Sequence, residues 1–153
     1  MPQDKYPQTR ETLVANLREV DEDGAPGENH LGNVGILGFI GGTGPEGRGL
    51  ALRMAIAGES VLIGSRDLER ATQAADSILK QVPSGLVRGA FNTEVARDAN
   101  LVFIALPYAA QKETLLQLKE PLAGKIVIDL VVPLSFDRNG ATALLVPEGS
   151  AAL

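Results

Sequence analysis

The chain has 153 residues, 44% of them hydrophobic and 22% charged, which is the size and composition of one ordinary globular domain. It contains no cysteine and one histidine, so disulfides, thiolate metal sites, cysteine nucleophiles and multi-histidine metal sites are excluded. The net charge of −5 without a basic stripe argues against a nucleic-acid partner, and the lack of a long apolar run or a secretory signal predicts a cytoplasmic protein with no membrane partner.

Residues 1–33 differ in pattern from the rest of the chain. Leu13, Leu17 and Val20 recur at helical spacing, and an acidic, turn-rich stretch follows over 21–29. We expect a short amphipathic helix on a linker, separate from a domain over 34–153. We favour an extension that packs on its own domain or frays over a partner-docking arm. His30 lies in this linker without a neighbouring acid, so we expect an exposed side chain rather than a catalytic base.

From residue 34 onward, short apolar runs alternate with helical patterns, which is typical of consecutive βαβ units in a parallel sheet. The fourth and fifth runs are almost continuously apolar, as expected for strands that helices bury on both faces. Right-handed crossovers, with the chain winding both ways from its first strand, predict a doubly wound, Rossmann-like α/β fold with strand order 3-2-1-4-5. The five predicted strands cover 34–40, 61–64, 86–88, 101–106 and 125–130.

Helical patterns lie between these strands, and turn residues end two of them. Gly58 follows the first pattern, and Pro83-Ser84-Gly85 follows the second. The predicted inner faces are Leu50, Met54 and Ala57 for the first helix, Ala71, Ala74, Ala75, Ile78 and Leu79 for the second, and Leu115, Leu116 and Leu118 for the third.

A glycine-rich turn, Gly42-x-Gly44-x-x-Gly47, joins the first predicted strand to the first helix. Such a turn uses glycine for a tight bend, for close approach of the backbone to a pyrophosphate, and for close packing of helix on strand. The first amides of the helix then point at the diphosphate, and the helix dipole favours its negative charge. A turn that merely joins two elements is the alternative. Glu46 would repel a phosphate if it pointed inward, so we expect it to face water.

The end of the second strand decides between NAD and NADP. An NAD enzyme usually offers a carboxylate there to the adenosine ribose, whereas this strand ends in Gly64-Ser65-Arg66. Ser65 and Arg66 can instead bind a 2′-phosphate, and Arg70 can add a second positive charge from the following helix. Two alternatives stay open: Asp67 could contact the ribose, or Ser65 or Asp67 could only cap the helix while the arginines are solvated.

These residues together resemble the NADPH-dependent F420 reductases, that is, the F420:NADP oxidoreductases. The resemblance covers about residues 34–153 and is more specific than the glycine turn alone. The motifs that carry it are Gly41-Gly42-Thr43-Gly44, Gly47-x-Gly49-Leu50-Ala51-Leu52-Arg53, Ala57-Gly58, Gly64-Ser65-Arg66, Gly124-Lys125-Ile126-Val127-Ile128-Asp129, Pro133-Leu134 and Pro147-Glu148-Gly149-Ser150-Ala151-Ala152.

The resemblance implies an oxidoreductase that binds NADP and passes a hydride between nicotinamide C4 and C5 of the deazaflavin coenzyme F420. The protein would then mainly position two rings, so no catalytic acid, base or nucleophile is assigned. By resemblance, the diphosphate lies along Thr43, Gly44, Pro45 and Glu46, the 2′-phosphate on Ser65, Arg66 and Arg70, and the ribose and nicotinamide side along Leu106, Pro107, Val131, Val132 and Pro133.

Two features depart from the family pattern. Val131-Val132 stands where a polar pair such as Thr-Asn is expected before Pro133-Leu134, and family members carry a further C-terminal segment that completes the deazaflavin cleft. A non-catalytic NADP(H)-binding module or sensor is therefore an alternative, and activity through a homo-oligomer is another. A reductase of imines or 2-hydroxy acids is a third interpretation. Asp129, at the end of the fifth strand, could orient a ligand or cap the next turn and is left unassigned.

Overall fold

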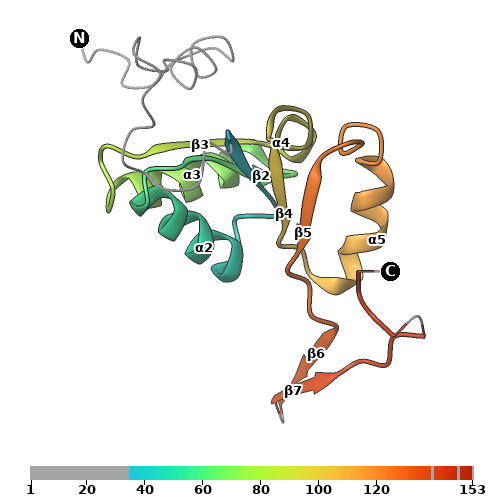
Figure 1. Ribbon diagram of the computed structural model, residues 1–153. Coiled ribbons are helices and arrows are strands. Elements are labelled where there is room, and N and C mark those ends of the chain that lie inside the picture. Colours follow the sequence, from blue (N-terminus) through green and yellow to red (C-terminus); the bar gives the residue numbers. More distant parts are fainter. Residues whose placement is uncertain (1–34, 139, 148, 153) are drawn as a thin grey trace. The chain divides into compact units, whose positions relative to one another are not determined.

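The central sheet consists of five parallel strands, β1 (Ile36–Ile40), β2 (Ser60–Ser65), β3 (Leu86–Phe91), β4 (Leu101–Ile104) and β5 (Ile126–Asp129). Their spatial order is β3-β2-β1-β4-β5, which confirms the predicted order and the Rossmann-like fold class (Figure 1). The computed structural model describes residues 35–138, 140–147 and 149–152, within the unit Gly35–Leu153. The predicted N-terminal extension, its helix and His30 lie outside the described residues, so the boundary at residue 34 stays a prediction.

Four helices of the described part of the chain flank the sheet: α2 (Pro45–Ile56), α3 (Leu68–Leu79), α4 (Asn92–Asp98) and α5 (Tyr108–Gln117). A Cβ added at Gly89 would lie 2.4 Å from main-chain atoms of α3, whereas one added at Gly38 would lie 2.6 Å from Val95 of α4. Since side chains alternate between the faces of a sheet, α3 and α4 cover opposite faces. Figure 1 shows α2 beside α3, and α2 packs on both β2 and α3.

The core is built where β1 lies between its neighbours. The ring of Phe39 stacks on that of Phe103 in β4, with centroids 4.7 Å apart and planes at 11°. Both residues are buried, and so are Leu62 and Ile63 of β2. This packing fixes the carboxyl ends of β1, β2 and β4 relative to one another.

The buried face of α2 differs from the predicted one. Its buried residues are Gly47, Ala51 and Ala55, while Leu50 and Met54 are half-buried and Ala57 is exposed. The helix turns its smallest side chains to the sheet because its main chain lies close to the strands, so the larger apolar residues are displaced to its flanks. The predicted inner face of α3 is confirmed for Ala71, Ala74, Ala75 and Ile78, with Leu79 half-buried.

The expectation that helices bury β5 on both faces is wrong. Ile126, Val127 and Ile128 keep 63%, 43% and 37% of their surface exposed. The strand is apolar, but it lies at one edge of the sheet and pairs with β4. An apolar run thus identified the strand correctly and its burial incorrectly.

Two short strands that were not predicted, β6 (Leu134–Asp137) and β7 (Gly140–Ala143), pair antiparallel after β5. Gly140 has a φ of +115°, which favours glycine at the end of the connecting turn. Among the described helices, none is long and apolar enough to cross a membrane.

Candidate functional site

The glycine loop between β1 and α2 is fastened to the carboxyl ends of two neighbouring strands. The N–H of Gly42 donates to the carbonyl oxygens of Phe39 at 3.2 Å and Gly64 at 3.0 Å. The N–H of Gly41 donates to Oδ1 of Asn92 at 3.1 Å. Gly41 has a φ of +73°, so the bend itself requires glycine. The loop is therefore held tightly against the end of β2, which the sequence had assigned to the 2′-phosphate.

The three glycines of the motif have three different surroundings. A Cβ on Gly42 would lie 2.7 Å from Cβ of Phe39, and one on Gly47 would lie 2.8 Å from Cα of Gly42 and 3.0 Å from Cβ of Ala105. These two glycines permit close packing of loop and helix on the sheet. Gly44 has an ordinary φ of −74°, and among the described residues none except its two chain neighbours has an atom within 4 Å of the position its Cβ would take. Neither backbone strain nor internal packing requires glycine at residue 44.

The start of α2 has no side-chain cap. Its N-cap residue, Gly44, offers no acceptor, and Pro45 in the first turn has no N–H. Glu46 is exposed, as expected, and Thr43 is half-buried. By contrast, Oδ1 of Asp67 caps the start of α3 by accepting from the N–H groups of Glu69 at 2.9 Å and Arg70 at 3.3 Å. Of these two helix starts, only that of α2 leaves its first amides without a side-chain acceptor.

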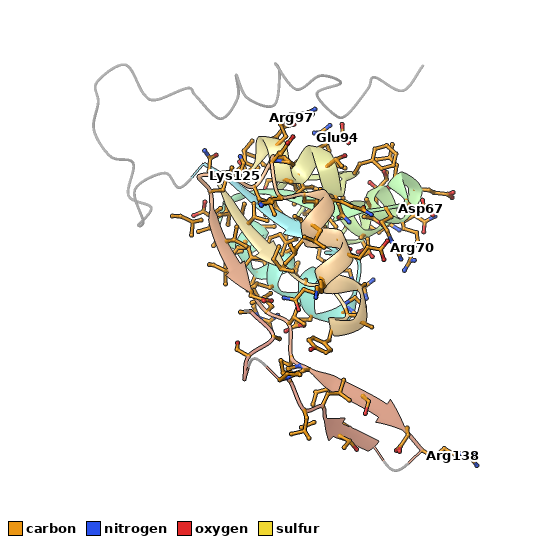
Figure 2. All side chains as sticks on the ribbon, turned by 90° about the vertical axis from the view of Figure 1, so that its right-hand side faces the viewer. Asp67, Arg70, Glu94, Arg97, Lys125 and Arg138 are labelled. Carbon is orange, nitrogen blue, oxygen red and sulfur yellow. The ribbon has the colours of Figure 1, made fainter. Side chains whose placement is uncertain are left out.

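The tip of β2 combines one buried hydroxyl with two exposed guanidinium groups. Ser65 is 8% exposed, and its Oγ accepts from the N–H of Asp67 at 3.1 Å. Arg66 and Arg70 are exposed. Figure 2 shows Arg70 and Asp67 at the same side of the unit, at the start of α3. Ser65 and Asp67 thus both make the capping contacts that the sequence had suggested. Because Oγ of Ser65 is the acceptor in its bond, the hydroxyl hydrogen is still available to donate to another group.

The loops after β4 and β5 complete the same edge of the sheet. A Cβ on Gly41 would lie 2.5 Å from Cδ2 of Leu106, so Leu106 packs directly against the glycine loop. Pro107 is the N-cap residue of α5. The N–H of Leu130 donates to the carbonyl of Ile104 at 3.1 Å, which joins the loop after β5 to the end of β4.

Val131 and Pro133 are held by their main chains. The N–H of Val131 donates to Oδ1 of Asp129 at 2.9 Å, and the carbonyl of Pro133 accepts from the N–H of Leu144 at 2.8 Å. Asp129 therefore caps the turn after β5, one of the two roles considered for it. Apart from Arg70, which lies in the first turn of α3, the candidate residues lie in the glycine loop, at the end of β2 or directly after β2, β4 and β5, at the edge at which open α/β sheets bind ligands.

Sequence reasoning missed two buried amides at this edge, Asn92 of α4 and Gln111 of α5, which are 6% and 4% exposed. Asn92 holds Gly41, and Nε2 of Gln111 donates to Oδ2 of Asp129 at 2.5 Å. Glu94 accepts from the N–H of Phe91 at 2.9 Å at the start of α4, but the side chain of Phe91 cannot accept in return, so the sequence lacks the full capping-box pattern that would have marked this helix start. Gln111 carried no local signal either.

Comparison with known proteins shows the family to which the chain belongs. Residues 36–133 match the family described as NADP oxidoreductase, coenzyme F420-dependent. The chain belongs to this family. It is 42% identical over 120 residues to the F420-dependent NADP reductase of Methanothermobacter marburgensis, and 39% identical over 123 residues to that of Methanocaldococcus jannaschii. Each match covers 76% of this chain and 54% of the relative, so the chain spans about half the length of the curated relatives it matches.

One solved structure agrees with this family, and another shows only the same fold. A crystal structure of a protein assigned as an F420-dependent NADP reductase from Arthrobacter sp. FB24 superposes with a TM-score of 0.58 at 31% identity, covering 76% of this chain and 54% of that one. A lactate dehydrogenase from Enterococcus mundtii reaches a TM-score of 0.55 at 17% identity, which shows the shared fold alone. The resemblance inferred from the sequence motifs is therefore confirmed at the level of the family.

Proposed function

We propose that this chain binds NADP(H) at the carboxyl edge of its sheet and forms the cofactor-binding half of an enzyme that transfers hydride between NADP(H) and coenzyme F420. The family match over residues 36–133 and the names of the curated relatives support this assignment. A non-catalytic binding module is not favoured, because the relatives at 39–42% identity carry reductase names.

The single observation that carries the proposal is the empty space at Gly44. A glycine costs conformational entropy, and residue 44 uses neither a left-handed φ nor tight internal packing in return. Space is left where a side chain would stand, and the adjacent first turn of α2 has no side-chain cap. Both features fit a diphosphate that approaches the main chain and accepts from its amides. We assign Gly42, Thr43, Gly44, Pro45, Glu46 and Gly47 to this diphosphate loop.

The choice of NADP over NAD rests on charge at the tip of β2. Arg66 and Arg70 are exposed and close in sequence to the buried Ser65, which suits a 2′-phosphate that needs charge-assisted donors. Oδ1 of Asp67, the rival ribose ligand, already accepts two main-chain N–H groups of α3. A carboxylate engaged in this way is a poorer candidate for the ribose than one that points freely from a strand end.

The nicotinamide side is assigned to Leu106, Pro107, Val131 and Pro133. When bound, NADPH supplies the hydride, so these residues need only hold the ring and exclude water. Leu106 packs against Gly41, and the loop after β5 is bonded to the end of β4 through Leu130. The side chains named here are apolar, so orientation of the ring depends on shape and on main-chain groups.

The experiment that tests the activity is to mix the chain with NADPH and oxidised F420 and to follow the deazaflavin absorbance. Loss of the oxidised F420 band together with NADPH oxidation supports the proposal. Tight NADPH binding with no transfer at high protein concentration would remove the catalytic part and leave the binding module. A sedimentation measurement with and without NADPH tests the predicted homo-oligomer, and the cytoplasmic location stays a prediction.

A further inference from the structure

Gln111 is a buried amide that lies outside the residues assigned to the cofactor, four residues after Pro107 in the sequence. It lies in the second turn of α5 and is 4% exposed. A buried amide is costly unless its hydrogen bonds are made, so its partner indicates its role. That partner is a carboxylate: Nε2 of Gln111 donates to Oδ2 of Asp129 at the end of β5.

Asp129 passes this contact on to the loop that follows β5. Its Oδ2 accepts from Gln111, and its Oδ1 accepts from the N–H of Val131 at 2.9 Å. Bonds in which one partner is ionised are shorter and stronger than neutral ones. A continuous hydrogen-bonded series, Gln111 to Asp129 to Val131, therefore connects α5 to the loop after β5.

One end of this series, Gln111, lies on helix α5, which begins at Tyr108 directly after Leu106 and Pro107. The other end, Val131, lies in the opposite loop and is itself assigned to the nicotinamide. Val131 and Val132 offer no polar side chain to the nicotinamide, so the orientation of their main chain decides which polar contacts this loop can make. Only main-chain groups of this loop can make polar contacts with the ring, and their direction follows from how the loop is held.

We propose that Gln111 is a positioning residue that acts through Asp129. It sets the spacing between the loop at 105–107 and the loop at 130–133, the two loops that we assign to the nicotinamide ring. The inference rests on the proposed function. It assigns to Gln111 no contact with cofactor or substrate. The adenosine and 2′-phosphate side, at the tip of β2, lies outside the influence of this series.

The test compares two ligands that differ by the nicotinamide half: NADPH, and 2′,5′-ADP, which has the adenosine and the 2′-phosphate alone. Gln111→Met keeps the side-chain length and removes the donor. Its dissociation constant for NADPH should rise about tenfold, the scale of one lost hydrogen bond to a charged group, while that for 2′,5′-ADP stays unchanged. An unchanged NADPH affinity, or an equal loss for both ligands, would overturn the inference, since a merely structural role weakens both alike.

A double variant that exchanges the amide and the carboxylate distinguishes loss of this hydrogen bond from a failure to fold. Gln111→Glu places two carboxylates together and should weaken NADPH binding, whereas Gln111→Glu combined with Asp129→Asn restores a donor and an acceptor with the roles exchanged. Recovery of NADPH affinity in the double variant supports the inference, and no recovery in a folded double variant contradicts it. If the unmodified chain binds no 2′,5′-ADP, the proposed function is wrong and this inference is wrong with it. If the chain binds 2′,5′-ADP but the variants do not give the expected changes in NADPH affinity, only the inference about Gln111 is contradicted.

Discussion

Oδ1 of Asn92 accepts the N–H of Gly41 at 3.1 Å, so the first residue of α4 holds the first residue of the glycine loop. The same oxygen lies 2.6 Å from the position that a Cβ on Gly64 would take. Asn92 thus fits between the ends of β1 and β2, at a point where a larger residue at 64 would displace it. One buried amide fixes the relative position of the two segments assigned to diphosphate and 2′-phosphate.

Replacing Asn92 by Ala should lower both stability and NADPH affinity. The partly buried N–H of Gly41 would lose its acceptor, which costs about 1–3 kcal/mol of unfolding free energy. Chemical denaturation measures this loss, and fluorescence titration measures the binding. Asn100→Ala is the matched control, because Oδ1 of Asn100 accepts the N–H of Ile36 at 2.9 Å at the opposite end of β1. The control should lose stability and keep its NADPH affinity; equal losses of affinity would contradict the role given to Asn92.

Gly44→Ala should separate binding from folding. The added Cβ meets no atom of the described part of the chain within 4 Å, its two sequence neighbours aside, and the φ of −74° suits alanine, so the unfolding midpoint should barely change. NADPH affinity should fall, because the methyl group enters the space assigned to the diphosphate. Gly47→Ala is the comparison: its Cβ would lie 2.8 Å from Cα of Gly42, so stability and affinity should fall together. Unimpaired NADPH binding by Gly44→Ala would remove the observation on which the proposed function depends.

Arg66→Ala should weaken NADPH binding by about 1.5–3 kcal/mol, the scale of a hydrogen bond between charged groups, and leave NADH binding almost unchanged. Isothermal titration with both nucleotides measures the difference. Arg138→Ala is the charge-matched control, since Arg138 lies at the turn between β6 and β7, away from the tip of β2 (Figure 2). Equal losses for NADPH and NADH would refute the assignment of Arg66 to the 2′-phosphate.

Asp67→Ala tests the rival interpretation of the same loop. Loss of an N-cap should lower the unfolding free energy by about 0.5–2 kcal/mol, which thermal denaturation can follow. NADPH affinity should not fall, because a negative charge beside Arg66 and Arg70 is removed. Asp67→Asn keeps a capping oxygen and should recover the stability. A large fall in affinity for both nucleotides in Asp67→Ala would instead indicate that this carboxylate contacts the ribose.

The strand order and the glycine loop could be predicted from the sequence because each has a local signature. Apolar runs marked four of the strands clearly and the third, over 86–88, weakly; right-handed crossovers, with the chain winding both ways from its first strand, then predicted their order. The position of Gly42, Gly44 and Gly47 between a strand and a helix identified the loop. Asp67 showed both of its possible roles in the sequence; the hydrogen bonds that Oδ1 accepts from Glu69 and Arg70 show the capping role, and the ribose role stays a prediction.

What the sequence could not provide depends on contacts between distant residues. Helix α4 is seven residues long, too short for a clear period, so Asn92 was invisible as a ligand of Gly41. Gln111 and Asp129 are 18 residues apart, and no local pattern pairs them. The inner face of α2 was misassigned because close packing favours Ala51 and Ala55 over larger residues. In each case the deciding quantity is the distance between elements, which single-sequence periodicity does not contain.

The exposed apolar surface of β5 bears on how the protein can be handled. An outer strand with Ile126, Val127 and Ile128 at 63%, 43% and 37% exposure is a template for unwanted pairing with other chains. Solutions of this chain should therefore grow turbid as concentration or ionic strength rises, whether or not nucleotide is bound. Ile126→Lys places a charge at the first residue of β5, at the end of the strand opposite the cofactor edge, and should raise the solubility limit of the protein.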